Sequence, residues 1–232
     1  MLFDYYFCKF NFNQMLIKKL CVKNIIWDVD GTLANINHAY YCFIKNHPKI
    51  NTFFKNFLYK DLDKALPIDN KYGSIELKTH PTLGKQLDKL FCESDEYYFD
   101  RPLYYGTDDV LYKLNDMKYK QFILSAGFNI KQKKKLLTQL FSNFPFIKLE
   151  VVLHDKKAMH NGDTKRKKIL TLLKKYNLKA DETILIDDRI YNIYAGLKAG
   201  VKVIHFRSEF TTKLPPDLSN VPEIQDIRQL IS

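Results

Sequence analysis

Short apolar runs, separated by stretches with helical spacing, constrain the fold of this chain more than any other feature. Most of the runs are rich in β-branched or aromatic residues, as expected of strands covered on both faces. Strands that alternate with helices are typical of a parallel, doubly wound, Rossmann-like α/β sheet. The predicted strands cover residues 24–28, 121–125, 149–153, 183–187 and 201–206.

Helical patterns lie between these strands. Thr107 can cap the first helix, whose opening turn holds Asp108 and Asp109, where acidic side chains are favoured. The other predicted helices cover 130–141, a segment capped by Asp163 or Thr164, and 193–198, which Gly200 closes.

Residues 33–100 interrupt this alternation. Helix-like stretches occur at 38–45, 52–66 and 82–91. The insertion begins where the first strand ends, which is the edge at which open α/β sheets bind ligands, so we predict a small helical cap over that edge. The alternative is a helical layer without a role at the site. The predicted organisation is an N-terminal extension over 1–20, a core domain over 21–32 and 101–232, and a cap over 33–100.

The formal net charge is +11, from 37 Lys and Arg against 26 Asp and Glu. Such an excess favours anionic partners through long-range attraction. The charge allows phosphorylated substrates, nucleic acid or an anionic membrane surface. Of these we expect a phosphorylated protein or small phosphomonoester, with contact to an anionic surface as a further option, and we do not expect nucleic acid. Individually, the lysine clusters are interpreted as solvated helix faces. They include Lys131 with Lys133, Lys134 and Lys135, and the run from Lys165 to Lys168.

The cysteines and the apolar segments indicate a protein of the cytoplasm. Cys8, Cys21, Cys42 and Cys92 have neither metal-type spacing nor a secretory signal before them, and we expect buried, reduced thiols. No apolar stretch is long enough to be a transmembrane helix or a signal peptide.

Two carboxylates follow the first predicted strand directly. Asp28 and Asp30 are two residues apart, so both point to the same side of an extended chain, and Gly31 then allows a sharp turn. Clustered carboxylates repel one another unless a cation or a proton separates them. One can therefore act as a nucleophile beside a metal while the other carries a proton as general acid.

Other strand ends add groups of the same kind. The fourth strand ends in Asp187 and Asp188, and Lys165 stands at the start of the helix before it. The second strand ends in Ser125, Ala126 and Gly127, a hydroxyl followed by backbone N–H groups that can approach an anion. Acids, a hydroxyl and a lysine at one edge of a sheet suit a divalent metal ion and a phosphoryl group.

These four segments, in this order, resemble the four motifs of the haloacid dehalogenase superfamily. The resemblance covers residues 25–206 apart from the insertion, and 184–200 is similar to the fourth motif and its helix. The chain is most similar to magnesium-dependent phosphatases, whose caps are minimal, so the long insertion is a departure. Residues 103–127 also resemble deoxyribonucleotidases.

The resemblance implies a role for each motif residue. Asp28 would be the nucleophile that forms an aspartyl-phosphate, and Asp30 the general acid and then the base for water. Ser125 and Lys165 would contact the phosphoryl group, with the backbone at Ala126 and Gly127. Mg²⁺ would be held by Asp28, the Asp30 carbonyl and Asp188, with Asp187 mainly outside the direct ligands and Asn192 either orienting Asp188 or capping the next helix.

The implied function is a Mg²⁺-dependent phosphomonoester hydrolase, with phosphotyrosine or aryl phosphate of proteins as the expected substrate. Alternatives are a nucleotidase, a small-metabolite phosphatase or phosphomutase, and a catalytically silent binding module. Asp30 argues against dehalogenation, because a halide leaves without a proton. Lys165 competes with Arg166, Lys167 and Lys168 for the lysine role.

Overall fold

The computed structural model describes residues 15–36, 43, 90–91, 102–127, 130–153, 163–207 and 213–232. The predicted N-terminal extension up to residue 14 and nearly all of the predicted cap lie outside these residues. Of the predicted cap helices, the described positions Phe43, Leu90 and Phe91 are helical. The cap therefore stays a prediction.

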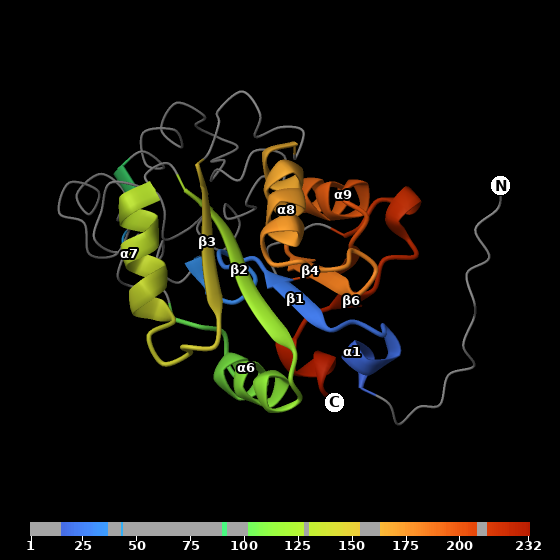
Figure 1. Cartoon of the computed structure of the whole chain (residues 1–232), viewed down its shortest axis with the longest axis horizontal. Coiled ribbons are helices and arrows are strands. Elements are labelled where there is room, and N and C mark those ends of the chain that lie inside the picture. The colour runs from blue at the N-terminus through green and yellow to red at the C-terminus, as the bar shows by residue number, and fades with distance from the viewer. Residues whose placement is uncertain are drawn as a thin grey trace, which may run out of the picture.

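The core is a six-stranded parallel sheet in the order β3-β2-β1-β4-β5-β6 (Figure 1). The predicted α/β sheet is confirmed, with all five predicted strands in place. The short β6 was not predicted, because two residues carry no recognisable pattern. The strands are β1 Asn24–Trp27, β2 Lys120–Gly127, β3 Lys148–Leu153, β4 Thr183–Asp187, β5 Lys202–Phe206 and β6 Glu223–Ile224.

Helices connect the strands much as the sequence predicts. Gly200 does close α9, with a φ of +79°. The prediction that Thr107 caps its helix was wrong: Thr107 is already the first helical residue, Gly106 precedes it in a left-handed conformation, and no side chain caps the end. The helices are α1 Leu16–Lys19, α6 Thr107–Asp116, α7 Ile130–Leu140, α8 Asp163–Lys175, α9 Ile190–Lys198, and the 3-10 turns η1 Pro216–Leu218 and η2 Ile227–Leu230.

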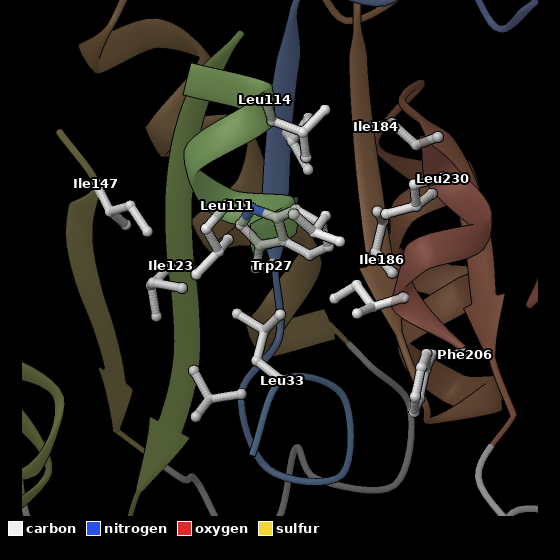
Figure 2. Close-up of a cluster of buried hydrophobic side chains, with 14 of the residues drawn as sticks. Trp27, Leu33, Leu111, Leu114, Ile123, Ile147, Ile184, Ile186, Phe206 and Leu230 are labelled. Atoms are coloured by element: carbon white, nitrogen blue, oxygen red, sulfur yellow. The ribbon is translucent and has the colours of Figure 1, made fainter. Parts of the chain in front are cut away.

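Alternate residues of β1 face opposite layers, as the period of a strand requires. Ile25 and Trp27 pack with α1, α6, α7 and η2 on one face, and Ile26 packs with α8 and α9 on the other. Figure 2 shows Trp27 between Leu111 of α6 and Ile186 of β4. The sheet is therefore covered on both faces, which explains why the middle residues of its central strands are mostly apolar.

This layering determines where the chemistry can take place. The strand β1 pairs with β2 on one side and β4 on the other. The helices that follow those two strands, α7 and α9, pack on opposite faces. In α/β proteins, ligands bind at the carboxyl ends of the strands where the connections change face in this way.

The predicted insertion leaves and rejoins the core at one place. Ala34 forms an antiparallel bridge with Leu103, and the Tyr104 N–H donates to the Leu33 carbonyl at 2.9 Å. Both ends of the insertion therefore lie beside the carboxyl end of β1. This geometry supports the predicted domain boundaries, which remain a prediction.

One cysteine contradicts the expectation of buried thiols. Cys21 is exposed and free, and it lies in the turn between α1 and β1 with a φ of +50°. A residue in this tight turn points its side chain outward, whatever its hydrophobicity. The other three cysteines lie outside the described residues. Within the described part of the chain, no helix is long and apolar enough to cross a membrane.

Candidate active site

The register of the sheet brings the acidic strand ends together. Trp27 of β1 pairs with Ile123 of β2 and Ile186 of β4. Asp28 follows Trp27 directly, and its N–H donates to the Ile186 carbonyl at 3.0 Å. Asp187 follows Ile186, so the ends of β1 and β4 present their carboxylates side by side.

Lys165 connects these two strand ends. Its Nζ lies 2.6 Å from Asp28 Oδ1 and also donates to Asp187 Oδ2. The side chain reaches them from the first turn of α8 and is buried. Of the basic residues in this run, Lys165 is the one placed at the acids: Lys168 faces Glu150, and Arg166 donates to the Lys198 carbonyl.

Burial and charge shift the pKa values of this group strongly. Burial raises the pKa of Asp28 to about 7, although Lys165 works in the opposite direction. Burial also raises the pKa of Asp188 to about 8, against the opposing effect of Arg189. Burial alone would lower the pKa of Lys165, but Asp187 and Asp28 outweigh it and raise that pKa. The lysine therefore stays charged, while two carboxylates are ionised only at a free-energy cost.

Asp188 is the carboxylate with an uncommitted oxygen. Its Oδ1 is buried and accepts no hydrogen bond from the described residues, while Arg189 Nε lies 3.2 Å from Oδ2. His205 is buried beneath it, with Nε2 3.2 Å from the Asp188 carbonyl and Nδ1 3.0 Å from Glu223. A buried oxygen without a donor is costly, and a cation beside it would offset that cost.

Ser125 also has an uncommitted buried group. The hydroxyl lies near the carboxyl end of β2 and has no hydrogen-bond partner among the described residues. Ala126 and Gly127 continue β2 past the predicted end, opposite Val152 and Leu153 of β3. Their contact with a phosphate stays a prediction, but the buried Ser125 hydroxyl is available for one.

Comparison with known protein families decides which kind of protein carries this site. The family of haloacid dehalogenase-like hydrolases matches residues 25–206. The chain belongs to that family. The match starts in β1 and ends in β5, so it spans the ends of β1, β2 and β4 and the start of α8, which hold the acids, the hydroxyl and the lysine.

Solved structures of the family share the whole fold at low sequence identity. A haloacid dehalogenase-like hydrolase from Streptococcus pneumoniae is 17% identical, with a TM-score of 0.55 over 91% of this chain and 97% of that one. CbbY from Rhodobacter sphaeroides, in complex with phosphate, is 13% identical with a TM-score of 0.55 over 90% and 96%. A dehalogenase with an intermediate complex is 12% identical with a TM-score of 0.57 over 90% and 96%. No curated protein matches.

The acids of this hydrolase can accommodate a divalent metal ion. Ligand oxygens of Asp28, Asp187 and Asp188 all lie within 4.8 Å of one another, and all three residues are buried. Carboxylate oxygens are the ligands that Mg²⁺ prefers. The orphaned Asp188 Oδ1 and the raised pKa values of Asp28 and Asp188 are the features that a bound cation would relieve. The residues therefore fit the predicted ion.

Asn192 has a different partner from the predicted one. Its Nδ2 donates to Asp187 Oδ1 at 3.0 Å, and not to Asp188. The same oxygen accepts the Arg189 N–H at 2.9 Å, while Asp187 Oδ2 accepts Lys165. The start of α9 thus donates these two hydrogen bonds to Asp187 and not to Asp188. With both oxygens in hydrogen bonds, Asp187 holds Lys165 in place. Its position outside the direct ligands of the metal stays a prediction.

Sequence reasoning missed two cations of the site. Lys133, interpreted as part of a solvated helix face, is 1% exposed, and its Nζ lies 2.6 Å from Asp30 Oδ2. Arg189, which was not considered, contacts Asp188. The spacing of Lys133 to Leu136, Leu137 and Leu140 was the available signal, because it places the lysine in line with the apolar stripe of α7.

Gly31 permits the close approach of β1 and β4 at the site. It has a φ of +88°, and a Cβ atom there would lie 2.5 Å from Asp188 Oδ2. We predict that Gly31→Ala lowers the free energy of unfolding by roughly 1–3 kcal/mol through backbone strain and also weakens Mg²⁺ binding by displacing Asp188. Chemical denaturation and calorimetric Mg²⁺ titration measure the two effects.

Gly200→Ala is the matched control. Gly200 has a similar φ of +79°, but a Cβ atom there would meet only the Ala180 Cβ at 3.8 Å. It should lose stability and keep Mg²⁺ affinity. Equal Mg²⁺ affinity in the two variants would contradict the role of Gly31.

Proposed function

We propose that this protein is a Mg²⁺-dependent phosphomonoester hydrolase that acts through a phosphoryl group carried on Asp28. The observation that supports it most is the pairing of a buried carboxylate, Asp28, held by Lys165 at 2.6 Å, with a second carboxylate two residues later, Asp30, held by Lys133. Transfer of a phosphoryl group from an alkyl phosphomonoester needs both a nucleophile that attacks phosphorus and a proton donor for the alkoxide that leaves. Loss of a halide needs only the first.

The proposed reaction has two balanced steps. In the first, an Asp28 oxygen forms a bond to phosphorus as the bond to the leaving oxygen breaks, and Asp30, which must enter this step protonated, gives that oxygen its proton. In the second, water gives a proton to Asp30 while its oxygen bonds to phosphorus, and the Asp28–phosphorus bond breaks. Inorganic phosphate leaves, and both carboxyl groups return to their starting states.

The other residues of the site hold the reacting groups in position and neutralise their negative charge. The charged Lys165 ammonium keeps Asp28 in position and offsets negative charge on the phosphoryl oxygens, and the uncommitted Ser125 hydroxyl can donate to one of them. The Asp28 and Asp188 carboxylates and the Asp30 carbonyl would hold Mg²⁺, which supplies positive charge against the phosphoryl group when bound. Asp187 accepts a hydrogen bond from Lys165 and another from Asn192, and so holds Lys165 in position at the strand ends.

The substrate we propose is a phosphotyrosine side chain or another aryl phosphate of a protein. The resemblance to magnesium-dependent phosphatases and the net charge of +11, which attracts acidic peptides, support it. A turnover screen with Mg²⁺ tests the function: p-nitrophenyl phosphate, phosphotyrosine peptides, nucleoside monophosphates, sugar phosphates and a 2-haloacid, side by side. Halide release without phosphate release would overturn the proposal, and inactivity on all of them would favour a silent binding module.

Asp30→Asn tests the acid–base role. Turnover should fall by ~10²–10⁴-fold, whereas Mg²⁺ affinity should persist because the proposed ligand is the backbone carbonyl. Alkyl phosphates should lose more than p-nitrophenyl phosphate, since nitrophenolate leaves without protonation. Turnover equal to wild type, measured at saturating substrate, would contradict the role of Asp30 in proton transfer.

A further inference from the structure

Lys133 occupies a position where the helix pattern calls for an apolar residue. On α7, Leu136 and Leu137 are three and four residues further along, and both are buried, at 4% and 0% exposure. Lys133 lies on this same stripe and is itself 1% exposed, whereas Lys134 beside it is exposed. A core-facing lysine is costly unless its ammonium group meets a partner that compensates for the lost water.

The partner is the residue to which we assign proton transfer. Lys133 Nζ lies 2.6 Å from Asp30 Oδ2, and the Asp30 side chain is 20% exposed. Charged groups at this distance form a strong hydrogen bond. Because Lys133 is buried, the packing of α7 restricts its side chain, a restriction that a flexible surface lysine would lack. The contact therefore determines where the Asp30 carboxylate lies relative to β1.

Each acid of the site forms an ion pair with one of three basic side chains. Lys165 holds Asp28 and Asp187, and Arg189 holds Asp188. Asp30 stands two residues from Asp28 and would be repelled by the other carboxylates. Lys133, which reaches it from α7 on the opposite side of the sheet from α8, provides the countercharge that the other two cations give elsewhere.

We propose that Lys133 is a positioning residue for the reaction: it fixes the Asp30 carboxyl group at the location from which its proton reaches the leaving oxygen. This inference rests on the proposed phosphatase function. Proton transfer depends steeply on placement, and a displacement of about 1 Å can cost ~10²-fold in rate. Because α7 follows β2, the same segment of chain that presents Ser125 to the phosphoryl group also sets the position of Asp30.

The test compares Lys133→Met with Lys134→Met. Methionine keeps the length and the apolar stem of the buried side chain but removes its charge, and Lys134 is the exposed neighbour on the same helix. We expect Lys133→Met to lower kcat on alkyl phosphates by ~10–10²-fold, with a smaller loss on p-nitrophenyl phosphate and little change in KM. Lys134→Met should match wild type, and Lys133→Arg should recover part of the loss.

A double-mutant cycle separates positioning from other roles. If Lys133 acts through Asp30, then Lys133→Met combined with Asp30→Asn should be no slower than Asp30→Asn alone. Multiplicative losses would overturn the proposal, and so would a raised KM at unchanged kcat, which would make Lys133 a phosphate-binding residue. A Lys133→Met variant with wild-type kcat on alkyl phosphates would also overturn it, leaving Lys133 as packing alone.

Thermal unfolding of each variant guards against a folding artefact. If Lys133→Met fails to fold, Lys133→Gln enters the same cycle, since it removes the charge and its shorter side chain reaches less far toward Asp30. The two proposals fail in different ways. A wild-type protein that hydrolyses none of the phosphates overturns both, whereas an active wild type with independent losses overturns only the role of Lys133.

Discussion

Replacing Asp28 with asparagine should abolish turnover while leaving a folded protein. Loss of a catalytic nucleophile typically costs on the order of 10⁴–10⁶-fold in kcat, and asparagine keeps the shape of the side chain without its nucleophilic oxygen. Burial raises the pKa of Asp28 to about 7, so the ionised carboxylate lowers the free energy of unfolding of the metal-free protein. Above that pH, Asp28→Asn should therefore be at least as stable as wild type by chemical denaturation.

The covalent state gives this prediction a direct readout. With Mg²⁺, BeF₃⁻ should bind wild type as a mimic of the phosphoryl group on Asp28, and Lys165 and Ser125 should contact its fluorines. Asp28→Asn should not bind it. In ¹⁸O-labelled water, the label should enter inorganic phosphate and not the Asp28 carboxylate. Label that accumulates in Asp28 would mean that water attacks the carboxyl carbon, as in a dehalogenase ester, and would contradict the mechanism.

Removal of Mg²⁺ should have an equally large effect. Chelation by EDTA should reduce phosphatase activity to background, and added Mg²⁺ should restore it. The reason is that the buried Asp28, Asp187 and Asp188 lie with ligand oxygens within 4.8 Å of one another, and their repulsion is unrelieved without a cation. Asp188→Asn should raise the Mg²⁺ concentration needed for half activity. Full activity in EDTA would contradict the metal site.

The stability of the metal-free protein should depend on pH with a definite sign. The pKa values of Asp28 and Asp188 rise from 3.8 to about 7 and about 8. Between pH 3.8 and about 8 the folded state binds more protons at these two carboxyl groups than the unfolded state does. Their contribution to the free energy of unfolding therefore falls as pH rises, and it levels off above about pH 8. Mg²⁺ should reverse the loss, because it binds the ionised carboxylates. Denaturation in EDTA should show a shallower fall for Asp28→Asn and Asp188→Asn, and an unchanged pH dependence in both would contradict the assignment.

The sheet and the placement of its acids could be predicted from the sequence. Runs such as residues 183–187 are mainly apolar because both faces of the sheet are covered. The residue types of such a run therefore predict a buried strand. Parallel strands end at a common edge, so Asp28, Asp187 and Asp188 had to meet once the strands were identified. Lys165 was preferred to the neighbouring basic residues because its spacing to Asp188 resembles that of the family.

What one residue contacts across the fold could not be predicted in the same way. Lys133 looked like one lysine among several, and only the packing of α7 shows that it faces Asp30 while Lys134 faces water. Asn192 was expected either to orient Asp188 or to cap the next helix, but the turn of α9 brings its amide to Asp187. Neighbouring side chains differ by about 100° in direction on a helix, so which of them reaches the site depends on helix rotation.

The sequence by itself determined the fold class, the order of the strand-end motifs and the identity of the acids at the site. The tertiary structure alone decided how the cations are shared among those acids, through Lys165 on Asp28 and Asp187, Arg189 on Asp188 and Lys133 on Asp30. The physical reason is that hydrophobic periodicity is a local property of the chain, whereas an ion pair joins residues from different elements. Its partners are known only when the elements are packed.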